Sequence, residues 1–159
     1  MSKICCFTGH RKISSLPIRE IESRLRKYLS VLIENEDFTE FRTGGATGFD
    51  SVAALTILKL KKQYPHIKLH LLLPCPGQDK YFTPLEKSLY QYTLEHADSV
   101  TYIQNYYTKD ALFVRNRALV DGSDLCVACL ERLEGGTYYT VSYARKQGIK
   151  AINIMRMQR

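Results

Sequence analysis

The 159-residue sequence has no apolar run that approaches the roughly 20 residues of a membrane-spanning helix. A secretory signal peptide is also lacking, because strand-like residues begin already at Ile4. We therefore expect a cytoplasmic protein with no membrane partner. There is no internal repeat, low-complexity segment or linker either, and the length suits one folding unit. We expect residues 1–159 to form a single domain.

An even set of cysteines, as in a disulfide framework, is lacking as well, because the chain has five of them. Without a secretory signal, free thiols are expected. Cys126 and Cys129 have C-x-x-C spacing, but residues 124–130 form the continuous apolar run of a buried strand. An odd separation along a strand sends two side chains to opposite faces, and the same holds for the adjacent Cys5 and Cys6. We expect no metal site, no redox chemistry and no cofactor.

Acidic residues are in deficit, with 16 Asp and Glu against 23 Lys and Arg, a net charge of +7 and a pI near 9.2. This balance favours anionic partners but does not distinguish a nucleotide from RNA or DNA. Much of the excess is scattered over helix ends, where cations complement the helix dipole. A dedicated nucleic-acid surface is therefore the weaker alternative to a small anion site.

Strand-like and helix-like segments alternate along the whole chain. The clearest helix start is residues 83–86, Thr-Pro-Leu-Glu, which form a capping box with proline at the first helical position. In that helix we expect Leu85, Leu89 and Tyr92 to form the buried stripe. The expected strands are 3–8, 38–42, 67–73, 99–104, 124–130 and 150–155, and the expected helices are 17–32, 48–63, 84–96, 108–120 and 137–147.

This alternation predicts parallel βαβ units with right-handed crossovers. The expected fold class is therefore α/β, a single-domain doubly wound, mostly parallel, Rossmann-like sheet with helices on both faces. In such sheets ligands bind at the carboxyl ends of the strands, near the point where the strand order reverses.

Two glycine-rich stretches separate a predicted strand from a predicted helix. Glycines let the backbone turn sharply and bring its N–H groups close to a ligand, and the following helix directs its positive dipole end there. We expect both stretches to bind phosphate at one edge of the sheet. For the first stretch, the alternative is a packing turn in which Asp50 is only the helix N-cap. The stretches comprise Gly44, Gly45, Ala46, Thr47, Gly48 and Asp50, and then Gly135, Gly136 and Thr137.

Two common nucleotide-binding motifs are absent. The first strand ends in Thr-Gly-His-Arg rather than in G-x-G-x-x-G, and Gly48 is followed by Phe-Asp rather than by the Lys-Ser/Thr of a Walker loop. A mononucleotide or ribose-phosphate derivative fits better, with Asp50 accepting hydrogen bonds from ribose hydroxyls. Arg11 and Arg115 are candidates to pair with phosphate. His10 has two candidate roles, as a general acid or ligand clamp and as a cap on backbone groups.

Together these motifs resemble the SLOG superfamily of Rossmann-like domains, which includes the DNA-processing protein DprA and the Lonely Guy phosphoribohydrolases. Within it, the chain is most similar to the small YpsA-like proteins. The resemblance spans the whole chain in order. It is carried by residues 8–11, 44–50, 74–78, 115–117 with 120–124, and 135–137 with 143–144.

The resemblance implies a nucleotide-type ligand bound across both glycine stretches. Some relatives cleave an N-glycosidic bond with an arginine and a glutamate. Arg115 is the counterpart of that arginine, but Thr140 stands where the glutamate would be. If the chain is an enzyme, Arg115 and Asp50 are its candidate catalytic residues. The implied ligand-binding residues are Gly9, His10, Arg11, Gly44, Gly45, Ala46, Thr47, Gly48, Asp50, Arg115, Asn116, Gly135, Gly136 and Thr137.

Three functions follow as hypotheses. The first is binding or sensing of a nucleotide-derived phosphorylated ligand, and the second is a nucleoside monophosphate phosphoribohydrolase. The third is single-stranded nucleic-acid binding of the DprA kind, supported by the positive charge and by Tyr102, Tyr106 and Tyr107, which could stack bases. The resemblance also suggests a homodimer.

Overall fold

The computed structural model describes residues 2–157, which form six strands, five α-helices and two short 3-10 helices. The strands are β1 Lys3–Gly9, β2 Phe38–Thr43, β3 Lys68–Leu73, β4 Ser99–Tyr102, β5 Leu125–Cys129 and β6 Lys150–Asn153. The helices are α1 Ile18–Asn35, α2 Phe49–Gln63, α3 Pro84–His96, α4 Ala111–Val120 and α5 Gly135–Lys146, with η1 Gln78–Tyr81 and η2 Ile154–Arg156 as the 3-10 helices.

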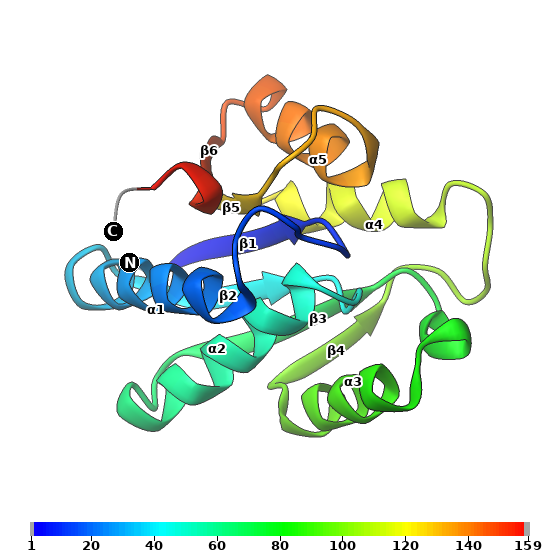
Figure 1. Ribbon diagram of the computed structural model, residues 1–159, viewed down its shortest axis with the longest axis horizontal. Coiled ribbons are helices and arrows are strands. Elements are labelled where there is room, and N and C mark those ends of the chain that lie inside the picture. The colour runs from blue at the N-terminus through cyan, green and yellow to red at the C-terminus, as the bar shows by residue number, and fades with distance from the viewer. Residues whose placement is uncertain (1, 158–159) are drawn as a thin grey trace.

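All six strands pair in parallel, in the order β4-β3-β2-β1-β5-β6 (Figure 1). The strand order reverses between β1 and β5, since the chain first winds outward from β1 to β4 and then returns to the other side of β1. The predicted Rossmann-like α/β fold class is therefore confirmed. β4 and β6 end earlier than expected, and α5 starts earlier, so that Gly135 and Gly136 belong to its first turn.

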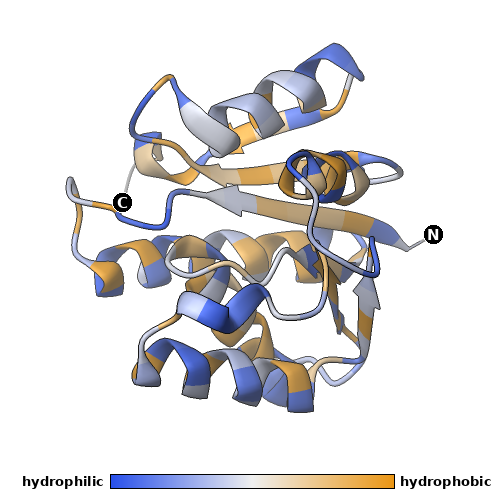
Figure 2. Ribbon diagram, turned by 90° about the vertical axis from the view of Figure 1, so that its right-hand side faces the viewer, coloured by the Kyte–Doolittle hydropathy of each residue, from blue (hydrophilic) through white to orange (hydrophobic). Residues whose placement is uncertain are grey.

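Helices cover both faces of the sheet. α1, α2 and α3 bury the larger core, in which the rings of Phe7, Phe41 and Phe49 lie together with centroids 6.2 and 6.4 Å from that of Phe7. α4 and α5 cover the opposite face, where Leu119 and Ala144 are buried. Figure 2 shows hydrophobic residues concentrated on the strands between these helix layers. Each fully buried Phe or Leu side chain contributes about 1.5–3 kcal/mol to the free energy of folding, relative to leaving it exposed.

The cysteine prediction agrees with the structure. All five cysteines are free and buried. Cys126 lies in the cluster beneath α4 and α5, together with Cys6, whereas Cys129 lies in the core beneath α1 and α2, together with Cys5. The two members of each sequence pair therefore do face opposite sides of the sheet.

The buried stripe expected on α3 is wrong, although its capping box is confirmed by the reciprocal hydrogen bonds of Thr83 and Glu86. Leu85 is 70% exposed, and the buried residues are instead Tyr90 and Thr93. α3 packs at the β4 edge of the sheet, where only a narrow strip of the helix finds apolar neighbours. In the described part of the chain, no helix has the length and apolar character needed to cross a membrane.

Candidate functional site

A cavity of about 620 Å³ opens at the carboxyl ends of β1 and β5, where the strand order reverses. This is the place where open α/β sheets bind ligands. The cavity brings together residues from both glycine stretches and from the exit of β1. Of the residues predicted from sequence, its walls contain Gly9, His10, Arg11, Ala46, Asp50, Arg115, Asn116, Gly136 and Thr137.

Five other predicted residues do not line this cavity, namely Gly44, Gly45, Thr47, Gly48 and Gly135. Sequence reasoning also missed several residues that do. Lys12, Lys109 and Arg132 add positive charge, and Leu112, Phe113 and Leu119 of α4 form an apolar wall. Only the position of Lys12 beside the 8–11 motif could have been found from the sequence.

The charge of the cavity wall is strongly unbalanced. Cationic side chains from four segments of the chain surround it, whereas Asp50 supplies the only carboxylate among its described lining residues. Such a wall attracts anions and raises their local concentration. The cations are Arg11, Lys12, Lys109, Arg115 and Arg132.

Asp50 fastens the first glycine stretch. It is the second residue of α2, and its Oδ2 accepts a hydrogen bond from the Ala46 N–H at 3.1 Å. The N-cap position belongs to Gly48, which has no side chain with which to cap the helix. The alternative in which Asp50 is only an N-cap is therefore wrong, because its carboxylate closes the loop that precedes the helix.

Other groups of this first stretch are also satisfied internally. The Gly44 carbonyl accepts a hydrogen bond from the Arg115 guanidinium and another from Gln78 Nε2 at 3.3 Å. The first N–H of α2, that of Phe49, donates to the His10 carbonyl at 3.2 Å. Two N–H donors at this end of α2, those of Ala46 and Phe49, are therefore used within the protein.

Packing explains the glycines of the first stretch. A Cβ on Gly44 would lie 2.6 Å from Arg115 Nη1, and a Cβ on Gly45 would collide with Leu73 Cδ2. Gly45 also has a φ of +74°, which disfavours any side chain. These glycines are therefore required by the protein's own neighbours, whatever the ligand.

Arg115 and Asp50 form a buried pair of opposite charges, each less than a tenth exposed. Burial raises the pKa of Asp50 to about 6, while the positive charge of Arg115 opposes that rise. Burial likewise lowers the pKa of Arg115, which Asp50 counteracts, so the guanidinium stays charged. Arg115 donates to Gly44, to Asn116 Oδ1 at 2.9 Å and to the Leu72 carbonyl at 3.5 Å. Much of its donor capacity is therefore spent within the protein.

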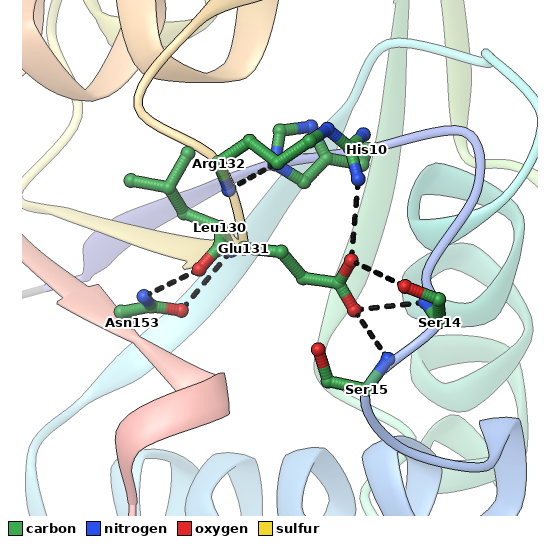
Figure 3. Close-up of polar contacts among 7 residues, drawn as sticks. All are labelled: His10, Ser14, Ser15, Leu130, Glu131, Arg132 and Asn153. Atoms are coloured by element: carbon green, nitrogen blue, oxygen red, sulfur yellow. Dashed lines mark hydrogen bonds and ion pairs between the residues drawn. The ribbon is translucent and has the colours of Figure 1, made fainter.

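The loops after β1 and β5 are joined by a polar network (Figure 3). The carboxylate of Glu131 accepts hydrogen bonds from the N–H groups of Ser14 and Ser15 at 2.8 and 2.7 Å, and from the Ser14 hydroxyl at 3.2 Å. The Asn153 amide bonds both the N–H and the carbonyl of Leu130, as a neighbouring strand would. Glu131 thus holds the loop that carries Arg11 and Lys12.

His10 belongs to the same network. Its Nε2 accepts a hydrogen bond from the Arg132 N–H at 3.2 Å, so the ring proton resides on Nδ1. Burial and the charge of Arg132 lower the pKa of His10, which keeps the ring neutral at pH 7. Of its two expected roles, the structure shows the cap on a backbone group.

Comparison with known proteins places the chain in a family. The protein-family model described as YspA SLOG family matches residues 5–158 of the chain. The chain belongs to the YspA SLOG family. It is 28% identical over 139 residues to the SPbeta prophage-derived protein YoqJ of Bacillus subtilis, covering 80% of this chain and 81% of that protein. It is 32% identical over 133 residues to a UPF0398 protein of Halalkalibacterium halodurans, and the match covers 82% of this chain and 70% of that protein.

Two solved structures of DNA processing protein A share the fold. The Helicobacter pylori protein, described for its single-stranded DNA binding mode, matches with a TM-score of 0.65 at 20% identity, covering 94% of this chain and 63% of its own. The Streptococcus pneumoniae protein matches with a TM-score of 0.64 at 17% identity, and the match covers 94% of this chain and 49% of that chain. This SLOG chain therefore spans roughly half to two thirds of those chains.

The second glycine stretch of this SLOG domain differs from the first in being open. The N-cap residue of α5, Glu134, makes no side-chain cap, and a Cβ on Gly136 would meet only Asn116 Nδ2, at 3.7 Å. Thr140, at the position where some SLOG enzymes have glutamate, is buried and donates to the Gly136 carbonyl at 2.8 Å. The start of α5 therefore faces the cavity with Gly136 and Thr137, and Thr140 supplies no carboxylate there.

The contrast between the two stretches gives a first prediction. Gly45→Ala should lower the free energy of unfolding by about 1–3 kcal/mol, because the new Cβ is strained by the positive φ and collides with Leu73. Gly136→Ala should change it by less than about 1 kcal/mol, since the space there is open. Urea unfolding of both variants measures the difference. Equal losses would mean that the glycines of the two stretches serve the same purpose.

Proposed function

We propose that the cavity binds a small phosphorylated ligand of the nucleotide type. The observation that carries the proposal is the wall of five cations and one carboxylate, into which the uncapped start of α5 opens. Helix N-termini and clustered cations are the usual partners of phosphate. The volume of about 620 Å³ lies within the roughly 300–1,000 Å³ of small-molecule sites.

The shape of the cavity also suits a ligand with an apolar, flat part. Leu112, Phe113 and Leu119 of α4 contribute apolar side chains to the cavity lining, which also includes Arg11 and Lys12. The Phe113 side chain is 42% exposed and meets the Tyr139 ring edge-on at 4.8 Å. An aromatic base could stack against such a side chain. A nucleoside phosphate therefore matches both walls.

The proposal is tested by isothermal titration calorimetry with AMP and adenosine. AMP should bind, and Lys109→Glu should weaken AMP binding about tenfold by reversing one wall charge. Lys150→Glu, which makes the same charge change at the exposed first residue of β6, is the matched control and should leave binding unchanged. If millimolar AMP, GMP, CMP and UMP all fail to bind, the cavity does not serve nucleoside monophosphates.

Single-stranded DNA binding is a second candidate, favoured by aromatic side chains at the same edge of the sheet. Tyr81, Tyr106 and Tyr107 are 87%, 73% and 71% exposed, in the loops that follow β3 and β4. The fold is also that of the H. pylori protein described as binding single-stranded DNA. Oligonucleotides of increasing length separate the candidates, since a strand-binding surface gains affinity with length and loses it steeply with salt.

We do not extend the proposal to N-glycosidase activity. The oxocarbenium-like transition state of that reaction needs a nearby carboxylate. Thr140 provides none, and Asp50, the only carboxylate among the described residues that line the cavity, is engaged with the Ala46 N–H. Release of free base and ribose 5-phosphate from AMP would show the activity directly.

A further inference from the structure

We propose that Ser99 is a nucleophile activated by His70, in a second site that accepts short carboxylic esters. The Ser99 hydroxyl oxygen lies 2.6 Å from His70 Nδ1, and His70 Nε2 lies 2.8 Å from Glu40 Oε1. A hydroxyl, a base within hydrogen-bond reach and a third group that orients the base are the parts of an activated nucleophile. This site is independent of the proposed nucleotide site, because the two cavities share no lining residue within the described chain.

Three adjacent strands place these side chains next to one another. His70 of β3 is the in-register partner of Ser99, the first residue of β4. Arg42 of β2 is the partner of His70 on the other side, and Glu40 lies two residues before Arg42 and therefore on the same face of β2. Since β4 is an edge strand of the sheet, no further strand of the sheet lies beyond Ser99.

The hydrogen bonds indicate where the proton of the neutral His70 ring resides. The Glu40 carboxylate can only accept, so the proton is on Nε2 and is donated to Oε1. Nδ1 is then the acceptor for the Ser99 hydroxyl. Ser99 thus directs its proton to a base before any substrate binds, as general-base catalysis requires. The two ring nitrogens have exchanged the places that they have in the Ser-His-Asp triad, where Nε2 faces the serine.

The three side chains are open to a ligand. Those of His70 and Glu40 are 24% and 27% exposed, and with Ser99 they line a cavity of about 370 Å³. This volume is at the lower end of the roughly 300–1,000 Å³ of small-molecule sites. A short acyl group therefore fits better than a long one.

The remaining wall of this cavity is mixed in character. Arg42 and Thr101 carry hydrogen-bond donors, and Arg42 uses its Nη1 on the Asp121 carbonyl at 2.7 Å. Ile4, Leu72 and Ala118 supply the apolar part of the described lining. Donors beside the nucleophile can bind an ester oxygen, on which negative charge develops during attack.

The acyl transfer has two steps. First, Ser99 Oγ forms a bond to the ester carbonyl carbon while its proton passes to His70 Nδ1. The bond from that carbon to the alcohol oxygen then breaks, and the alcohol leaves with the proton from His70. Water attacks the acyl-serine in the same way, which releases the carboxylic acid and restores the Ser99 hydroxyl. Glu40 stabilises the positive charge on the His70 ring in both steps.

A fluorophosphonate probe tests the nucleophile, because an activated serine attacks its phosphorus and displaces fluoride. Mass spectrometry should find the label on Ser99, and Ser99→Ala should remove it. His70→Gln, at a partly exposed position, should fold and slow the labelling about a hundredfold, since a positioned general base contributes roughly 10²–10⁴-fold. Ser88→Ala, at an exposed position of α3, is the control and should leave the labelling of Ser99 unchanged.

Glu40→Gln tests the positioning residue. The amide oxygen can still accept from His70 Nε2, but the charge that stabilises the protonated ring is lost. The maximal labelling rate should fall about tenfold, whereas the probe concentration that gives half of that rate should stay the same. A purely structural role for Glu40 would leave the maximal rate unchanged.

Hydrolysis of p-nitrophenyl acetate tests the substrate class, and the original protein should release nitrophenol at least tenfold faster than Ser99→Ala. The proposal is overturned if the probe labels Ser99 no faster than Ser88, or if His70→Gln is labelled as fast as the original protein. Equal rates of ester hydrolysis by the original protein and Ser99→Ala would also overturn it. None of these results depends on whether AMP binds, so the proposed function is tested separately.

Discussion

Replacing Arg115 by alanine should lower the free energy of unfolding by about 3–5 kcal/mol, the usual cost of leaving a buried charge without its partner. Asp50 would remain buried without the cation that acts on it most strongly, and the Gly44 carbonyl and Asn116 Oδ1 would each lose a donor. Urea unfolding monitored by circular dichroism at pH 7 measures the loss.

Arg117→Ala is the matched control, because it removes the same side chain two positions along α4. Arg117 donates a hydrogen bond to the Tyr139 hydroxyl at 2.9 Å, and this contact is partly exposed to solvent. Removing the Arg117 side chain should therefore lower the free energy of unfolding by no more than about 1 kcal/mol. If the Arg115 and Arg117 variants are equally stable, Arg115 does not hold the first glycine stretch. A loss of enzymatic activity in Arg115→Ala would not by itself assign it a catalytic role, since the site would be disrupted in any case.

Asp50→Asn should stabilise the protein above pH 7, by up to about 3 kcal/mol. Burial raises the pKa of Asp50 from near 3.8 to about 6, so between these values the folded state binds a proton that the unfolded state has lost. Stability should therefore fall as the pH rises from about 4 to about 6, and stay lower above it. Asparagine avoids this cost and can still accept from the Ala46 N–H.

Thermal unfolding across pH 3–8 measures the effect. The two proteins should converge below about pH 4, where the carboxyl of Asp50 is protonated in both the folded and unfolded states. Asp37→Asn, at an exposed position whose φ of 61° asparagine tolerates, is the control for removing one charge. A gain from Asp50→Asn that is the same at pH 3.5 and pH 8 would contradict the raised pKa. An ionised group kept in the cavity at a cost in stability is typical of a functional site.

The sequence was sufficient to predict the fold because alternation of strands and helices leaves few topologies. It also predicted that the glycine stretches lie at strand ends, and the cavity contains residues of both. It could not predict where long side chains point. Arg115 looked like a phosphate ligand, yet its guanidinium turns toward Gly44 and Asn116. The buried face of α3 was missed because both Leu85 and Tyr90 are large side chains that can be buried, and only the place of the helix at the sheet edge decides between them.

Lys109 and Arg132 were missed for a different reason. They come from loops after β4 and β5, and nothing in the local sequence relates them to the exit of β1. Only the strand order and the loop paths bring them to the same cavity. The role of each glycine could not be predicted from the sequence either. A glycine that packing requires, as at Gly45, and a glycine that faces open space, as at Gly136, look alike in the sequence.

The Glu131 network has a consequence for how a ligand gains its affinity. Four hydrogen bonds from Ser14, Ser15 and Arg132 converge on one carboxylate, and they hold two loops in place before anything binds. Little conformational entropy is then lost on that side of the cavity when a ligand enters. Adjustment to ligands of different size should fall instead to the opposite side, formed by the start of α4 and the tyrosine-bearing loop before it.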